Sequence, residues 1–152
     1  LFRHYEPLIQ QASIFAIFIT LITGTAGNTG TQSLAVAIRK IGLHEEEQSF
    51  WKVLVQEGTT GLGIGLISGV VVFGIVSLWQ GSLVLGGIIG FAMFASIFVA
   101  ALTGTCIPFA LEKFNFDPSI ASGPFITTVN DLTSVLVYFT IVSQFISVYL
   151  AK

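Results

Sequence analysis

Charged residues are scarce in this chain of 152 residues. Six Lys and Arg and eight Asp and Glu make 9 % of the sequence, whereas a soluble domain carries about 25 %. A water-soluble fold of this length could not cover its surface with so few charges. Acidic residues also outnumber basic ones, so no face neutralises phosphates and nucleic acid is excluded as a partner. The single cysteine, Cys106, excludes an internal disulfide.

The composition is that of an integral membrane protein. Hydrophobic residues make up 53 % of the chain, and the mean hydropathy is +0.89. No Lys, Arg, Asp or Glu lies within residues 7–38 or 58–111, and about 20 apolar residues are enough for one helical crossing of the bilayer. The second stretch is long enough for two crossings, and Gln-Gly-Ser after Trp79 predicts the turn between them. The sequence therefore predicts an all-α, polytopic helix bundle in the lipid bilayer, a single domain with four transmembrane helices at about residues 8–38, 53–79, 83–111 and 119–150.

The basic residues predict the orientation of these helices. Most of them lie in two predicted loops, residues 39–57, which also carry three consecutive glutamates at 45–47, and residues 112–118. The positive-inside rule places both charged loops in the cytoplasm of a multi-pass protein of the cell (plasma or inner) membrane, with both termini outside. Because such a chain begins outside the cell, we expect a further segment upstream of residue 1, such as another membrane helix.

Glycines spaced four residues apart mark the second and third predicted helices. The second helix carries Gly61, Gly65 and Gly69, and the third carries Gly86 and Gly90. Small residues at this spacing form a groove on one helix face and let two backbones approach closely. We therefore predict that these five glycines serve helix packing.

A polar segment interrupts the first predicted helix. Residues 23–33 read Thr-Gly-Thr-Ala-Gly-Asn-Thr-Gly-Thr-Gln-Ser and include Asn28, Thr31 and Gln32. Hydrocarbon offers no partners for these groups, and irregular backbone is tolerated at membrane depth only within protein or beside water. We expect local unwinding here, with freed carbonyls that line an ion pathway. The alternative is a glycine-rich helix contact with hydrogen bonds from Ser and Thr.

A second polar segment opens the fourth predicted helix. Asp117 before Pro118 predicts a helix N-cap with proline at the first helical position. Farther along, Gly123-Pro124 is expected to disturb the helix and to free carbonyl groups.

Asp131 is the one charge that the sequence places at membrane depth, since the others are expected in loops or at helix ends. A carboxylate there costs on the order of 3 kcal/mol. No Lys, Arg or His is expected at that depth, so Asp131 is either protonated or paired with a cation from outside. Thr127 and Thr128 lie three or four residues away and flank the same helix face. These residues indicate a metal site at Asp131.

The chemistry of this inventory favours a hard cation. Carboxylate, amide, hydroxyl and carbonyl oxygens suit Mg²⁺ or Ca²⁺, and the two segments contain no imidazole or thiolate. The choice among Mg²⁺, Mn²⁺, Co²⁺ and Ca²⁺ stays open. One carboxylate is a poor complement for a divalent ion, whereas a homodimer with its two-fold axis along the pore presents two copies of Asp131.

Residues 24–33 and 117–131 resemble the transmembrane domain of the MgtE family of magnesium channels and transporters, which is related to eukaryotic magnesium solute carriers. The resemblance implies a homodimer, with five membrane helices per chain and a pore at the interface between the second and fifth. Helices one and four of this chain would correspond to these two, and the first family helix and the cytoplasmic regulatory domains would be absent. Asp131 would match the central Mg²⁺ site, where the ion stays largely hydrated, and Asn28, Thr31 and Thr127 would be polar lining.

The residues and the resemblance together predict a divalent cation channel or transporter rather than an enzyme. Hydrated Mg²⁺ would pass between helices one and four, with Asp131 as the ion site. The pore lining is expected to include Asn28, Thr31, Gln32, Gly123, Thr127 and Thr128. A proton- or sodium-coupled carrier that uses Asp131 is the main alternative. An intramembrane aspartyl protease needs two facing aspartates, and a purely structural subunit leaves both polar segments unexplained.

Overall fold

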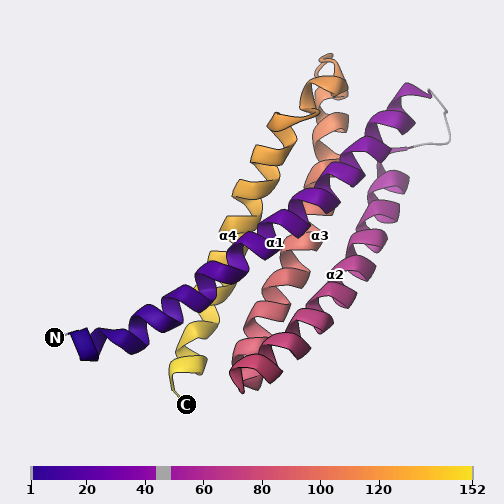
Figure 1. Cartoon of the computed structure of the whole chain (residues 1–152). Coiled ribbons are helices and arrows are strands. Elements are labelled where there is room, and N and C mark those ends of the chain that lie inside the picture. The colour runs from indigo at the N-terminus through magenta and orange to yellow at the C-terminus, as the bar shows by residue number, and fades with distance from the viewer. Residues whose placement is uncertain (1, 44–48, 152) are drawn as a thin grey trace.

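A computed structural model describes residues 2–43 and 49–151, and the side chains of residues 13–43 and 49–151. The described part consists of helices joined by short turns and forms an elongated bundle (Figure 1). Its elements are α1 (Phe2–Gly42), α2 (Phe50–Gln80), α3 (Leu83–Lys113), the short 3₁₀ helix η1 (Pro118–Ala121) and α4 (Pro124–Leu150). Each of the four α-helices contains a stretch long and apolar enough to cross a membrane. For the described residues, the prediction of an all-helical fold with four helices able to span a membrane is therefore confirmed.

The charged segment of residues 39–57, predicted as a loop that leads into the second helix at about residue 53, is largely helical in its described residues. α1 continues through Arg39 and Lys40, and Lys52 lies in the first turn of α2. Ser49 has an extended backbone, and its hydroxyl accepts a hydrogen bond from the Lys52 N–H, which caps α2. Lys40 Nζ donates a 2.6 Å hydrogen bond to Gln56 Oε1 and links the two helices. The acidic run at 45–47 lies outside the described residues.

The turn predicted after Trp79 is present between α2 and α3. Gly81 ends α2 with φ 66°, a left-handed conformation that glycine adopts without strain. The Ser82 hydroxyl then accepts a 3.2 Å hydrogen bond from the Leu85 N–H and caps α3. Two short-range signals thus reverse the chain within two residues.

The predicted start of the fourth helix at residue 119 is wrong in detail. Asp117 caps η1 rather than α4, since its Oδ1 accepts a 3.0 Å hydrogen bond from the Ser119 N–H. That hydrogen bond holds the pKa of Asp117 below its ordinary value. Gly123 then has φ 68°, and α4 begins at Pro124. The left-handed φ of Gly123 interrupts the helical path, and Pro124, which lacks an N–H, suits the first helical position of α4.

α3 is the central helix of the bundle. It contacts α1, α2 and α4, whereas α1 and α2 touch at few positions. In Figure 1, α2 and α4 lie on opposite sides of the bundle and α1 crosses it diagonally. Apolar side chains from all four helices meet in one core, which includes Ile22, Val76, Ile89 and Tyr138.

The glycines predicted to serve packing lie at the contact of α2 and α3. A Cβ atom added at Gly69 would lie 2.8 Å from the Gly90 carbonyl oxygen, and one added at Gly90 would lie 2.7 Å from the Gly69 oxygen. A Cβ atom added at Gly61 would lie 2.6 Å from Ala101 Cβ, and one added at Gly65 would lie 3.0 Å from the Phe94 carbonyl oxygen. One added at Gly86 would lie 2.8 Å from the Phe73 carbonyl oxygen. The two backbones are therefore in direct contact, with no room for methyl groups.

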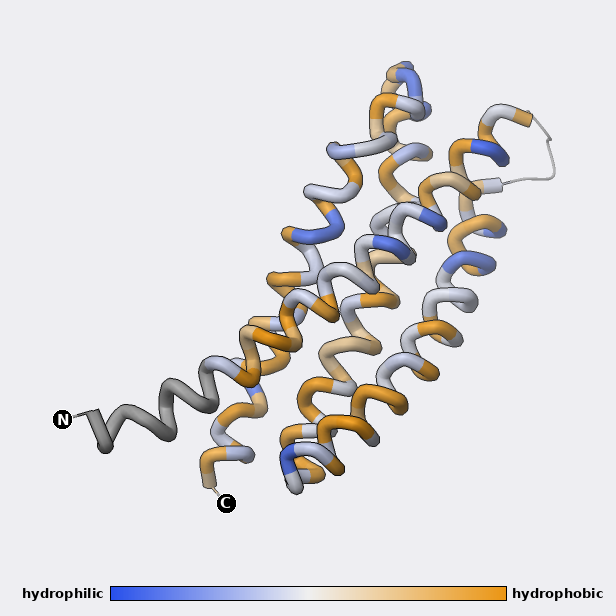
Figure 2. Tube along the Cα trace, viewed as in Figure 1, coloured by the Kyte–Doolittle hydropathy of each residue, from blue (hydrophilic) through white to orange (hydrophobic). Residues whose placement is uncertain are grey.

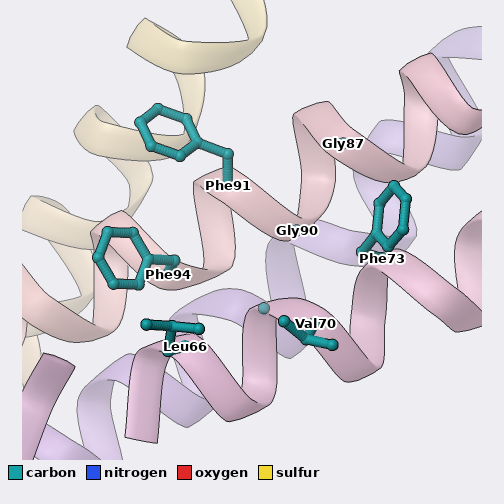
Figure 3. Close-up of a pocket in the computed structure, with 8 residues that line it drawn as sticks. Leu66, Val70, Phe73, Gly87, Gly90, Phe91 and Phe94 are labelled. Carbon is teal, nitrogen blue, oxygen red and sulfur yellow. The ribbon is translucent and has the colours of Figure 1, made fainter. Parts of the chain in front are cut away.

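Much of the outer surface of the bundle is apolar. Leu78 is 88 % exposed and Ile67 is 70 % exposed, as suits a lipid-facing surface. In Figure 2, hydrophobic residues dominate much of the helices, and hydrophilic ones gather at the end where α3 leads into η1. Beside the glycine contact, the rings of Phe73, Phe91 and Phe94 border a shallow groove of about 220 Å³ (Figure 3).

Candidate functional site

The polar segment of α1 keeps a regular helical backbone, so the predicted unwinding is wrong. α1 is continuous from Phe2 to Gly42. Threonine hydroxyls explain how these polar groups are accommodated, because they donate to carbonyls one turn earlier. The hydroxyls of Thr25 and Thr31 each donate over 2.8 Å, to the carbonyl oxygens of Leu21 and Gly27. The helix therefore satisfies its hydroxyls locally and frees no backbone carbonyl by unwinding.

Two faces of this α1 segment differ in their surroundings. Gly27, Gly30 and Ser33 are buried against other helices. The residues predicted to line a pathway, Asn28, Thr31 and Gln32, are exposed on the outside of the bundle. The segment thus combines a small-residue packing face with an exposed face of amide and hydroxyl groups.

The first turns of α4 carry the other predicted site residues. Gly123, Thr127, Thr128 and Asp131 are all exposed. The Thr127 hydroxyl donates to the Gly123 carbonyl over 3.2 Å, and the Thr128 hydroxyl donates to the Pro124 carbonyl over 2.8 Å. Both hydroxyl oxygens keep lone pairs that can accept a hydrogen bond from water.

The structure brings the two polar segments together at Gly27 and Asp131. A Cβ atom added at Gly27 would lie 3.3 Å from Asp131 Oδ1, so the carboxylate rests against the α1 backbone. Within the described residues Asp131 has no hydrogen bond or ion pair, and no group of three His, Cys, Asp or Glu side chains gathers there or elsewhere. The site is therefore a single free carboxylate beside an exposed strip of hydroxyl and amide groups.

Sequence reasoning missed the residues behind this surface. Asn130 is fully buried, and its amide faces Gly30 of α1. Gly104 of α3 meets the backbone of Gly30 from another side. The spacing of Gly27 and Gly30 by three residues was an available signal for a helix crossing in α1, and the next residue to Asp131 was a candidate to face inward.

Glu57 corrects the expectation that charges other than Asp131 lie in loops or at helix ends. It lies in α2, one turn before Gly61, and is only 6 % exposed. Its neighbour Gly58 packs against Leu102 of α3. The chain therefore holds a second carboxylate on a membrane-spanning helix, directed inward where Asp131 is directed outward.

Comparisons with known proteins agree on one family. The family model described as MgtE, a divalent cation transporter, matches residues 19–141. The magnesium transporter MgtE of Enterococcus faecalis is 52 % identical over 146 residues, which cover 95 % of this chain and 32 % of that protein. The magnesium transporter MgtE of Bacillus subtilis is 39 % identical over 94 % of this chain and 32 % of its own length. That of Thermus thermophilus is 30 % identical over 90 % of this chain and 30 % of its own length. The chain thus spans about a third of the length of these relatives.

Proposed function

Because the chain belongs to the MgtE family of divalent cation transporters, we propose that it forms the membrane-spanning, ion-conducting part of a magnesium transport protein. The family is one of transporters rather than enzymes, and the helices make the chain a multi-pass membrane protein. The observation that carries the proposal is the exposed carboxylate of Asp131 beside the polar strip of α1.

Two copies of the chain complete the site in this proposal. A charged side chain facing lipid at membrane depth costs about 3 kcal/mol, so the surface around Asp131 needs water or another protein surface. A two-fold axis beside α1 and α4 supplies both, since it brings two Asp131 carboxylates to one pore. This arrangement also accounts for the exposed positions of Asn28, Thr31, Gln32, Thr127 and Thr128.

The transported Mg²⁺ ion keeps much of its water shell, because this ion dehydrates reluctantly. The two Asp131 carboxylates attract it and accept hydrogen bonds from its waters. The hydroxyls of Thr127 and Thr128 already donate to backbone carbonyls, so the lone pairs on their oxygens are free to accept hydrogen bonds from the waters around the ion. Conduction follows because water-mediated binding is weak enough for release. The charged ends at residues 39–57 and 112–118 face the cytoplasm.

Mg²⁺ uptake into vesicles that contain the purified protein tests the proposal. Even at the dielectric constant of bulk water, about 80, a divalent ion about 5 Å from a carboxylate gains about 1.7 kcal/mol, which exceeds a factor of ten. We therefore expect Asp131→Ala to abolish uptake and Asp131→Asn to lower it more than about tenfold. Glu112→Gln, which neutralises an exposed carboxylate at the end of α3, is the matched control and should leave uptake unchanged.

The same vesicles separate a channel from a coupled carrier. Uptake through a channel continues when proton and sodium gradients are collapsed, whereas a carrier that uses Asp131 requires one of them. Normal uptake in the Asp131→Ala protein would refute the site. Mn²⁺, Co²⁺ and Ca²⁺ offered in place of Mg²⁺ establish which divalent ions the site accepts.

A further inference from the structure

Three helices meet at one point next to the candidate site. We call Gly30 of α1, Gly104 of α3 and Asn130 of α4 the three-helix junction. A Cβ atom at Gly104 would lie 3.0 Å from the Gly30 carbonyl carbon and 3.1 Å from its Cα. A Cβ atom at Gly30 would lie 2.6 Å from Asn130 Cγ and 2.8 Å from Asn130 Oδ1. The junction therefore has no space for one added methyl group.

Asn130 is an unusual side chain for such a position. It has no exposed surface, and neither Oδ1 nor Nδ2 has a hydrogen-bond partner among the described residues. Such a group costs about 1–3 kcal/mol, which an apolar residue of similar shape would avoid. Complete burial also leaves the amide little freedom to rotate away from α1. The side chain of Asn130 thus acts as a fixed wedge between the backbone of α4, to which it belongs, and Gly30 of α1.

The wedge and the carboxylate are consecutive residues. Neighbouring residues point about 100° apart around an α-helix, so Asn130 faces the junction while Asp131 faces outward beside Gly27. The rotation of α4 that seats Asn130 against Gly30 therefore also sets the direction of Asp131. We propose that Asn130 is a positioning residue that holds Asp131 in its ion-binding orientation through its contact with Gly30. The role of Asp131 in this inference rests on the proposed function.

A second contact makes the position of α4 sensitive to this wedge. The Tyr138 hydroxyl donates a 2.6 Å hydrogen bond to the Phe15 carbonyl of α1. Eight residues separate Asn130 from Tyr138, which is about 12 Å along the helix. A shift of about 1 Å at the junction, pivoting at Tyr138, moves Asp131 by nearly the same amount. Misplacements of this size are known to cost up to about a hundredfold in the function of a site.

The contact supplies its own rescue experiment. The three atoms nearest to a Cβ at Gly30 all belong to the Asn130 side chain beyond its Cβ, so Asn130→Ala removes every one of them. Gly30→Ala should displace α4, and adding Asn130→Ala should restore its place. Gly24→Ala is the matched control, because a Cβ there meets nothing within 4 Å. Gly104→Ala should not be rescued, because its overlap is with the Gly30 backbone.

Thiol crosslinking reads the geometry without using ion transport. In a Cys106→Ala background, the Gly27→Cys/Asp131→Cys pair places two thiols beside each other, and mercury(II) bridges them and blocks labelling by a maleimide. We expect Gly30→Ala to slow bridging about tenfold, Gly24→Ala to leave it unchanged and Gly30→Ala/Asn130→Ala to restore it. With Asp131 intact, the Mg²⁺ concentration for half-maximal uptake should rise about tenfold in Gly30→Ala and return in the double variant.

The outcomes separate this inference from the proposed function. Equal bridging in the Gly30→Ala and Gly24→Ala proteins overturns the positioning role, as does a Gly30→Ala defect that Asn130→Ala leaves in place. Restored bridging without restored Mg²⁺ dependence overturns the link between position and binding. Normal uptake by Asp131→Ala refutes the proposed function, and the crosslinking series still decides whether Asn130 holds α4 in place.

Discussion

Replacing Gly69 with alanine tests whether direct backbone contact holds α2 against α3. The added Cβ would lie 2.8 Å from the Gly90 oxygen and 3.3 Å from Phe94 Cβ, so the helices must separate by about 0.5–1 Å. One pair of atoms in contact attracts with about 0.1–0.2 kcal/mol, and a gap of that size removes about a quarter to a half of this attraction. For about 50 atom pairs near the crossing, the free energy of unfolding should fall by about 1–5 kcal/mol.

Gly63→Ala is the control for this prediction. It lies in the same helix, and its Cβ meets nothing within 4 Å. Both substitutions gain up to about 1 kcal/mol of helix propensity, so their difference isolates the helix contact. Unfolding by sodium dodecyl sulfate in mixed micelles, followed by tryptophan fluorescence, measures both. Trp79 is a suitable reporter because its ring lies 6.4 Å from the Phe18 ring of α1. Equal stability of the Gly69→Ala and Gly63→Ala proteins would refute the reasoning.

Two further predictions concern single hydrogen bonds. Tyr138→Phe removes the 2.6 Å hydrogen bond to the Phe15 carbonyl and should cost about 0.5–1.5 kcal/mol in the same unfolding assay; an unchanged free energy would contradict a structural role for this bond. The pKa of Asp117 is lowered by the hydrogen bond from the Ser119 N–H, so its charged form stabilises η1. That stabilisation is present above the ordinary aspartate pKa and is lost as the pH falls through the lowered value. Asp117→Ala should therefore remove this pH dependence from the free energy of unfolding. If the Asp117→Ala protein keeps the same acid dependence, Asp117 is not its source.

The sequence predicts the number of helices and their approximate ends because both follow from one-dimensional quantities. Bilayer thickness sets the length of a span, and the charge-free stretches of residues 7–38 and 58–111 show where spans fit. Local chemistry adds the turn at Gly81 and the cap at Asp117. The same reasoning does not reveal which helices touch, because lipid tails and a protein interior are equally apolar. The pairing of helices one and four was predicted only through the family resemblance.

The errors in the prediction share a physical origin. A segment rich in Gly and Thr was expected to unwind, but a threonine hydroxyl reaches the carbonyl one turn earlier, so polar composition alone does not break a helix. Glu57 was expected in a loop or at a helix end because it belongs to a run of charges, yet α2 begins at Phe50 and buries it. Composition gives the polarity of a segment, whereas helix rotation decides which of its groups are buried.

Helix rotation also gives the strongest reason to place a water-filled or protein-covered surface beside α4. Asn130 and Asp131 are neighbours, and the fold buries the neutral amide without partners while exposing the carboxylate. A carboxylate that faces lipid at membrane depth costs about 3 kcal/mol. The observed rotation carries both penalties, the unpartnered amide and the outward charge. In the proposed dimer, the outward surface meets water, a cation and a second copy of the chain, so the outward charge has partners and only the amide penalty remains.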